Sequence, residues 1–173
     1  MELINNFNSI SISGRYIYGY LCLLNSIKNK QEEKLPNELD VLLKEFVESN
    51  ELDGWHEKIE EVLPSVIMQK DYEIGYYEVI DSSFYDVLKE YYEKLSDETL
   101  KIIDDLFTIG FSNLYGEFDS SESMEYLKNI IDLMSENNLK LPDFNIVENC
   151  SVTQRNGWGD LTKLDDYLIN YNS

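Results

Sequence analysis

The single histidine of this 173-residue chain, His56, limits the catalytic and metal-binding chemistry that the sequence can support. His56-Glu57 begins like the zinc-binding pattern His-Glu-x-x-His, but residue 60 is glutamate and no second histidine can complete the ligand set. A Ser-His-Asp triad or a Cys-His pair would need the same histidine, and neither cysteine lies in a recognisable nucleophile signature. We therefore expect no hydrolytic chemistry by these routes and interpret His56 as a partly exposed helix residue.

Residues 49–60 resemble a calcium-binding EF-hand loop at several positions, with glycine sixth and glutamate twelfth. The first position is Ser49, however, where the motif requires an acidic ligand, so we interpret the stretch as the start of a helix. The sequence also lacks a phosphate-binding glycine loop and a Glu-x-x-His pair for a metal site in a helical bundle. We predict a protein that is not an enzyme and that has no cofactor and no bound metal; an enzyme with a site made of acids alone is a third hypothesis.

Charge is the most unusual property of the sequence. The chain carries 34 acidic and 14 basic residues, a net charge of −20, and residues 51–150 alone hold 24 of the acids and 7 of the bases. Nucleic acid and anionic membranes are bound through clusters of Lys and Arg, so neither is expected as a direct ligand. The middle of the chain is predicted to present a negative face that would steer a basic partner.

The cysteines and the apolar segments bear on the compartment. Cys22 and Cys150 show neither a disulfide-framework spacing nor a Cys-x-x-Cys motif, which favours a reducing environment. The apolar run Tyr16–Leu24 is too short to cross a bilayer and lacks the cleavage site of a signal peptide. We predict a cytoplasmic protein without membrane contact, and the sequence leaves its oligomeric state open.

Helical spacing of apolar residues recurs along the whole chain. It predicts an all-α fold: a single compact domain, residues 1–173, of about six to eight helices. No segment alternates over the length of a strand, and Ser9–Ser13 and Asp143–Val147 are the only weak strand candidates. The last helix is expected from Leu161 to Ile169. The predicted helix caps are Ser11 or Ser13, Asn37, Asp53, Ser83 and Ser96.

The stretch Asp71–Lys94 has the strongest character of a recognition surface. It holds six of the thirteen tyrosines and seven carboxylates against two lysines. Tyrosine offers a large contact area at low conformational cost, which favours it at binding surfaces. The part from Ser83 to Leu95 is predicted to be helical, whereas Gly75 leaves the conformation of residues 71–80 open.

A helical projection divides the predicted helix into three sides. Its buried side is predicted to consist of Phe84, Val87, Leu88, Tyr91 and Leu95. Tyr85 and Tyr92 fall at the edge of this side, where they could form a ledge for a partner, or where they could simply border the core. The predicted partner-binding residues are Tyr72, Glu73, Tyr77, Glu78, Tyr85, Asp86, Glu90, Tyr92 and Glu93.

The pairs Tyr76-Tyr77 and Tyr91-Tyr92 lie among carboxylates in a small, very acidic chain that is predicted to be all-helical. In this it resembles the immunity proteins of bacterial polymorphic toxin and bacteriocin systems, including the tyrosine-and-acid surface of bacteriocin DNase immunity proteins. The turn at residues 156–159, Asn-Gly-Trp-Gly, is similar to the ends of some larger helical immunity families. The resemblance implies stoichiometric binding of a cognate toxin domain, a basic nuclease in the simplest case. The alternative is a DNA-mimic or phage-type inhibitor of a nucleic-acid-binding protein.

Overall fold

The computed structural model describes residues 3–112 and 121–171, and it confirms the predicted all-α fold. Within these residues the backbone forms helices and two isolated β-bridges but no strand. The elements are η1 (Leu3–Ser9), α1 (Ile12–Lys30), α2 (Asn37–Glu48), α3 (Leu52–Val62), α4 (Pro64–Ile67), α5 (Ser82–Tyr92), α6 (Asp97–Phe111), α7 (Ser121–Glu136), η2 (Phe144–Ile146), η3 (Gln154–Gly157) and α8 (Leu164–Tyr171).

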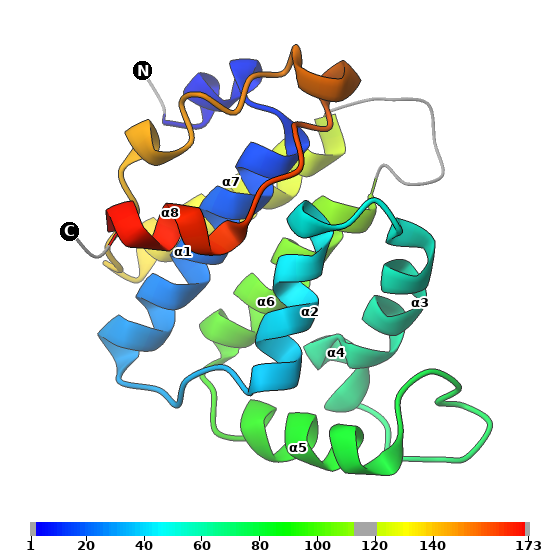
Figure 1. Cartoon of the computed structure of the whole chain (residues 1–173). Coiled ribbons are helices and arrows are strands. Elements are labelled where there is room, and N and C mark those ends of the chain that lie inside the picture. Colours follow the sequence, from blue (N-terminus) through cyan, green and yellow to red (C-terminus); the bar gives the residue numbers. More distant parts are fainter. Residues whose placement is uncertain (1–2, 113–120, 172–173) are drawn as a thin grey trace.

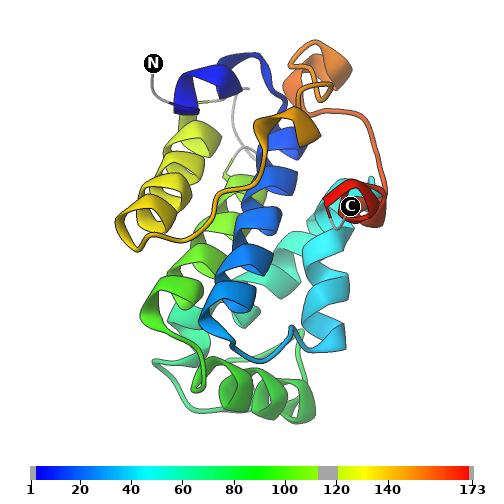
Figure 2. The ribbon, with the colours of Figure 1, turned by 90° about the vertical axis from the view of Figure 1, so that its left-hand side faces the viewer.

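Helix α1 is the centre of the fold. It packs along α6 and α7, and the three helices lie side by side in Figures 1 and 2. The apolar run Tyr16–Leu24 lies in α1, and nearly all of its residues are buried. Ser11 caps the helix as predicted, because its hydroxyl accepts a hydrogen bond from the backbone N–H of Gly14 at 3.3 Å.

The tyrosines of α1 are core residues whose polar ends connect separate parts of the chain. Tyr16 donates to the carbonyl of Leu43 at 2.8 Å, and Tyr18 donates to the carbonyl of Pro142 at 2.9 Å. Tyr20 contacts the carboxylate of Asp40 at 2.5 Å. Burial of these large side chains is favourable because each hydroxyl keeps a hydrogen-bond partner.

Helices α2 to α5 cover the other side of α1 and α6, and α5 crosses below them (Figure 1). Trp55 of α3 is fully buried and donates from Nε1 to the carbonyl of Leu42 at 2.9 Å. Gly110 lets α6 approach this indole closely, since a Cβ at that position would lie 2.6 Å from Cη2 of Trp55. The close contact fixes α3, and therefore the segment that follows it, relative to α6.

The C-terminal segment passes back over the start of α1 and ends in α8, which packs on α2. The backbone N–H groups of Ser11 and Ser13 donate to the carbonyls of Cys150 and Trp158. The last helix begins at Leu164, later than the predicted Leu161, because the residues before it bind α2 in an extended form. Thr162 donates to the carbonyl of Val47, and the N–H of Leu164 donates to the carboxylate of Glu48.

Three of the predicted caps require correction. Asp81 caps α5 in place of Ser83, since its carboxylate accepts both the N–H of Phe84 at 2.9 Å and the hydroxyl of Ser83 at 2.7 Å. Helix α3 begins at Leu52, one residue before the predicted cap Asp53. Asn37 is the first residue of α2 and follows its N-cap, Pro36, whereas Ser96 caps α6 as predicted. No helix in the described part of the chain combines the length and apolar character needed to cross a membrane.

Candidate interaction surface

The tyrosines of α5 face the protein core. Tyr85 is 5% exposed, Tyr91 3% and Tyr92 0%. Each hydroxyl donates to a backbone carbonyl: Tyr85 to Lys70 at 2.9 Å, Tyr91 to Glu33 at 3.2 Å and Tyr92 to Val62 at 2.9 Å. Of the two alternatives for Tyr85 and Tyr92, burial supports the one in which they belong to the core, and neither side chain offers a ledge to a partner.

The side of α5 that was predicted to be buried is in fact covered by the rest of the protein only in part. Leu88 and Tyr92 pack into the core, whereas Phe84 is only partly buried and Val87 is 41% exposed. Carbonyl groups at the ends of neighbouring segments accept the tyrosine hydroxyls, which removes the cost of burying them. The helical projection assigned Phe84, Val87, Leu88, Tyr91 and Leu95 to the buried side, but it contains no information on the backbone carbonyls that accept the tyrosine hydroxyls.

Residues 70–81 form a loop between α4 and α5, referred to below as the 70–81 loop. The Glu61 carboxylate at the end of α3 accepts backbone N–H groups from Glu78 at 2.7 Å, Val79 at 3.0 and 3.1 Å, and Ile80 at 2.9 Å. Gly75 has φ of +91°, a left-handed conformation that side chains rarely adopt. These contacts give the loop one defined shape without regular secondary structure.

A cluster of tyrosine rings forms the base of the loop. Tyr72 and Tyr77 stack with ring centroids 5.3 Å apart, and the ring of Tyr85 lies 5.2 Å from that of Tyr77. Tyr77 is 4% exposed, and burial, followed by the neighbouring hydroxyls of Tyr85 and Tyr76, raises its pKa to about 12. Tyr77 therefore stays protonated at neutral pH and donates to the carbonyl of Lys70 at 3.3 Å.

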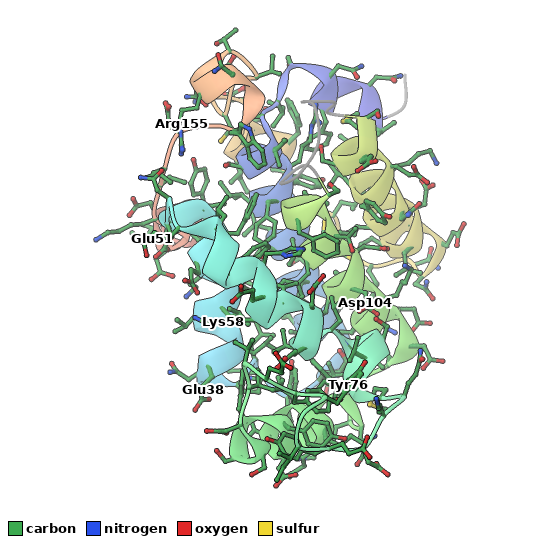
Figure 3. The ribbon with its side chains drawn as sticks, turned by 90° about the vertical axis from the view of Figure 1, so that its right-hand side faces the viewer. Glu38, Glu51, Lys58, Tyr76, Asp104 and Arg155 are labelled. Carbon is green, nitrogen blue, oxygen red and sulfur yellow. The ribbon has the colours of Figure 1, made fainter. Side chains whose placement is uncertain are left out.

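The tip of the loop presents apolar groups among carboxylates. Ile74 is 93% exposed and Tyr76 is 46% exposed, and Figure 3 shows Tyr76 at the lower end of the molecule. The ammonium group of Lys70 lies 3.1 Å from the centroid of the Tyr76 ring, which restrains this side chain. Asp71, Glu73 and Glu78 are exposed around the tip. Ile74 and Tyr76 therefore place apolar surface beside negative charge at the tip of the loop.

The predicted binding residues thus divide into two groups. Tyr77, Tyr85 and Tyr92 are buried and Tyr72 is partly buried, so these residues support the surface from below. The five predicted carboxylates are exposed: Glu73, Glu78, Asp86, Glu90 and Glu93. Of these, Glu90 binds the ammonium group of Lys94 at 2.9 Å, and this hydrogen bond lowers the pKa of Glu90. Sequence analysis missed Ile74, although an isoleucine beside a glycine in an acidic segment was a usable signal.

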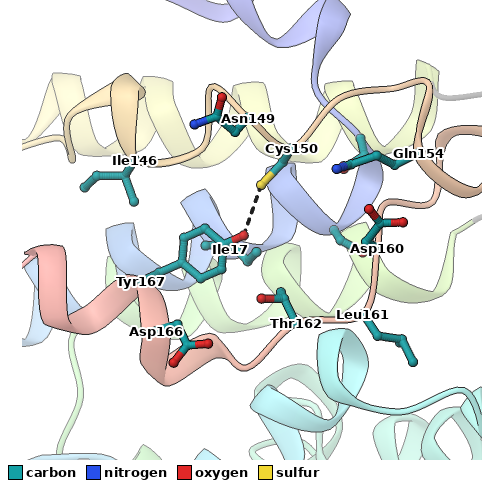
Figure 4. A pocket seen from close by; sticks show the side chains of 12 residues that line it. Ile17, Ile146, Asn149, Cys150, Gln154, Asp160, Leu161, Thr162, Asp166 and Tyr167 are labelled. Carbon is teal, nitrogen blue, oxygen red and sulfur yellow. Dashed lines mark hydrogen bonds between the residues drawn. The ribbon is translucent and has the colours of Figure 1, made fainter.

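A separate hollow of about 420 Å³ lies where the C-terminal segment passes α1 (Figure 4). Sγ of Cys150 and the hydroxyl oxygen of Tyr167 are 3.3 Å apart within it. Burial raises the pKa of the Cys150 thiol, and the charge of Asp160 adds to the effect. Cys150 is therefore a neutral thiol at pH 7, and the described side chains that line the hollow include no histidine, lysine or arginine that could activate it.

His56 lies partly buried on α3, where its ring meets Phe111 edge-on at 5.5 Å and its Nε2 is 3.8 Å from Glu60. In the described ranges, no three His, Cys, Asp or Glu side chains come together in a way that could hold a metal ion. Comparison of the chain with family models, curated proteins and solved structures finds no match.

Proposed function

We propose that this protein is an immunity protein that binds and neutralises a cognate bacterial toxin domain, in the simplest case a basic nuclease. The observation that carries the proposal is the tip of the 70–81 loop, where Ile74 and Tyr76 are exposed between Asp71, Glu73 and Glu78. A partner that fits this tip offers an apolar contact bordered by lysine or arginine.

Long-range charge would bring the partner to the tip. The excess of 24 acids over 7 bases in residues 51–150 creates a negative field, and this field accelerates encounter with a basic surface. Because Glu61 and the tyrosine cluster already hold the loop in one shape, docking costs little conformational entropy. Steering and a pre-organised loop together favour fast and tight binding.

Inhibition would follow from where the carboxylates lie. A nuclease binds phosphate groups through cationic side chains in its cleft. Glu73 and Glu78 flank the apolar tip, so a tip seated at the mouth of such a cleft brings their carboxylates to the groups that otherwise bind phosphate. The bound protein would then exclude the substrate without chemistry of its own.

The experiment begins with the gene adjacent to the one that encodes this chain. Its product, or the C-terminal domain of that product, is expressed in a bacterial host alone and together with this protein. The proposal expects growth arrest by the neighbour alone, and rescue by the wild-type chain. A double variant, Ile74→Ala with Tyr76→Ala, should rescue poorly, whereas Ile169→Ala, altered at an exposed site on α8, should rescue fully. A harmless neighbour, or rescue that is independent of Ile74 and Tyr76, would argue against the proposal.

The alternative, an inhibitor that mimics DNA, makes a different prediction. The exposed carboxylates of α5, Asp86 and Glu93, would then act as phosphate substitutes, and binding would depend on charge alone. Duplex DNA would compete for the partner under either hypothesis. Loss of binding on substituting Ile74 is expected only for the immunity-type surface.

A further inference from the structure

A groove lies between α2 and α5, and residues 79–81, which precede α5, also line it. Its volume is about 560 Å³. Figure 3 shows two residues of its border, Glu38 on α2 and Lys58 on α3. Its apolar lining consists of Val41, Leu42, Val79, Ile80, Phe84 and Val87.

Three well-exposed valines line the groove. Val41 is 57% exposed, Val79 42% and Val87 41%. They are three of the eight large hydrophobic residues that are well exposed in the described ranges. Single scattered exposed residues need no explanation, but three exposed valines in one apolar hollow are typical of a site covered by another molecule.

The border of the groove is acidic. Glu38, Glu45 and Asp81 line it, and the exposed Asp86 lies on the neighbouring side of α5. Lys58 is the one cation among the described residues that line it, and its Nζ lies 3.9 Å from the carboxylate of Glu45, so this pair adds no net charge and Glu38 and Asp81 leave the border acidic. The complementary occupant has an apolar side and carries Lys or Arg beside it.

A second copy of this chain does not meet that description. Two copies of net charge −20 would bring acidic borders together, and like charges across an interface oppose association. Addition of a strand needs an exposed sheet edge, and the described residues form no strand. The groove extends along α2 from Asn37 to Glu45, about 12 Å or two turns of helix. Its lining therefore matches the apolar side of a helix with anchors three and four residues apart.

We infer that the groove between α2 and α5 receives an amphipathic helix of a protein partner, with an apolar side and flanking Lys or Arg residues. The inference rests on the proposed function and specifies the partner further: the toxin domain would contact the loop tip and place such a helix in the groove. Val79 belongs to both surfaces, since it lies in the 70–81 loop and lines the groove.

A selection for helices tests the inference without knowledge of the partner. A displayed library of helical peptides of about 18 residues, or five turns, is selected against the wild-type protein at physiological salt. Selected peptides are then measured by fluorescence anisotropy against Val41→Lys, Val87→Lys and the control Ile169→Lys. The control adds the same charge at an exposed site outside the groove, and circular dichroism checks that each variant is folded.

The expected peptides carry apolar residues at helical spacing with Lys or Arg beside them. Val87→Lys should weaken their binding by about tenfold or more, as expected for a residue at the centre of a small interface, while Ile169→Lys leaves it within about twofold. In NMR spectra the methyl signals of Val41, Val79 and Val87 should shift on titration. Selection of no such helix, or equal binding to wild type and Val87→Lys, would overturn the inference. So would a dimer in sedimentation that Val87→Lys dissociates.

The two proposals fail in different ways. If the neighbouring gene product binds the wild type and the double variant Val41→Lys with Val87→Lys equally, the groove inference fails and the proposed function stands. If selected helices bind the groove but the neighbouring gene product is harmless and does not bind, the proposed function fails and the groove inference stands.

Discussion

Both carboxylate oxygens of Glu61 accept the backbone N–H of Val79, at 3.1 and 3.0 Å. Through this pair the end of α3 determines where the 70–81 loop returns toward α5. The same side chain also binds the N–H groups on either side, those of Glu78 and Ile80. One carboxylate thus shapes both the loop tip and one wall of the groove.

Replacing Glu61 with alanine should release the loop. Three backbone N–H groups lose a charged acceptor, and the free energy of unfolding should fall by about 1–2 kcal/mol. Urea unfolding gives this value, and hydrogen exchange should show faster exchange at the amides of residues 78–80. Glu57→Ala, an exposed change on the same helix, is the matched control and should leave both measurements unchanged. Equal exchange at residues 78–80 in the two variants would refute this role of Glu61.

Substitution of Tyr92 should affect stability and not recognition. Tyr92→Phe removes the donor to the buried carbonyl of Val62 and should cost about 1–2 kcal/mol of unfolding free energy. Tyr92→Ala also leaves a cavity and should cost about 3–5 kcal/mol. Tyr76→Phe, at an exposed ring, should cost almost nothing. Thermal unfolding of the three variants distinguishes a core tyrosine from a surface tyrosine, and a stable Tyr92→Ala variant would contradict the packing described here.

Asp105 should make stability depend on pH. It is 1% exposed; its Oδ1 binds Lys101 at 2.7 Å, while its Oδ2 has no hydrogen-bond partner among the described residues. Burial raises the pKa of Asp105, so the folded protein holds this proton more tightly than the unfolded chain. The contribution of Asp105 to stability therefore rises as the pH falls from neutral through the raised pKa, and it is constant below the ordinary aspartate value.

Asp105→Asn should remove this part of the pH dependence and should raise stability at pH 7 by about 1 kcal/mol, because no charge is then buried. The matched control is Asp132→Asn on α7, whose carboxylate also pairs with a lysine four residues earlier but is 49% exposed. Thermal unfolding at several pH values from about 5 to about 7 compares the two variants. A stability loss at pH 7 larger for Asp105→Asn than for Asp132→Asn would contradict the prediction.

Substitutions that change charge and substitutions that remove apolar contact should affect different rate constants of binding to the partner. Glu73→Lys with Glu78→Lys weakens the field around the tip and should slow association. Ile74→Ala removes contact area and should speed dissociation, with association nearly unchanged. Surface plasmon resonance at several salt concentrations measures both rates. Association that does not slow as salt rises would count against electrostatic steering.

Much of the fold could be predicted from interactions between residues that are close in sequence. Ser11 and Ser96 cap the helices expected of them, since the hydroxyl of a serine before an apolar repeat binds the free N–H groups of the first turn. Helical spacing of the apolar residues also predicted the all-α fold. These features depend only on neighbours in sequence.

The site was less predictable because its form depends on residues far apart in sequence. The inward position of Tyr85 and Tyr92 requires the carbonyls of Lys70 and Val62 as acceptors. The shape of the 70–81 loop depends on Glu61, which lies 17 to 19 residues before the amides it binds. Helical periodicity contains no information on either relationship.

Calorimetric titration tests whether the tip of the 70–81 loop binds a basic toxin domain, as proposed. The product of the adjacent gene is titrated with the wild type, with the Ile74→Ala, Tyr76→Ala double variant and with Ile169→Ala. The proposed function predicts one-to-one binding with a Kd of about 1 nM or below for wild type and Ile169→Ala. The double variant should bind about a hundredfold more weakly. Absence of wild-type binding, or equal affinity of the double variant, would contradict the claim.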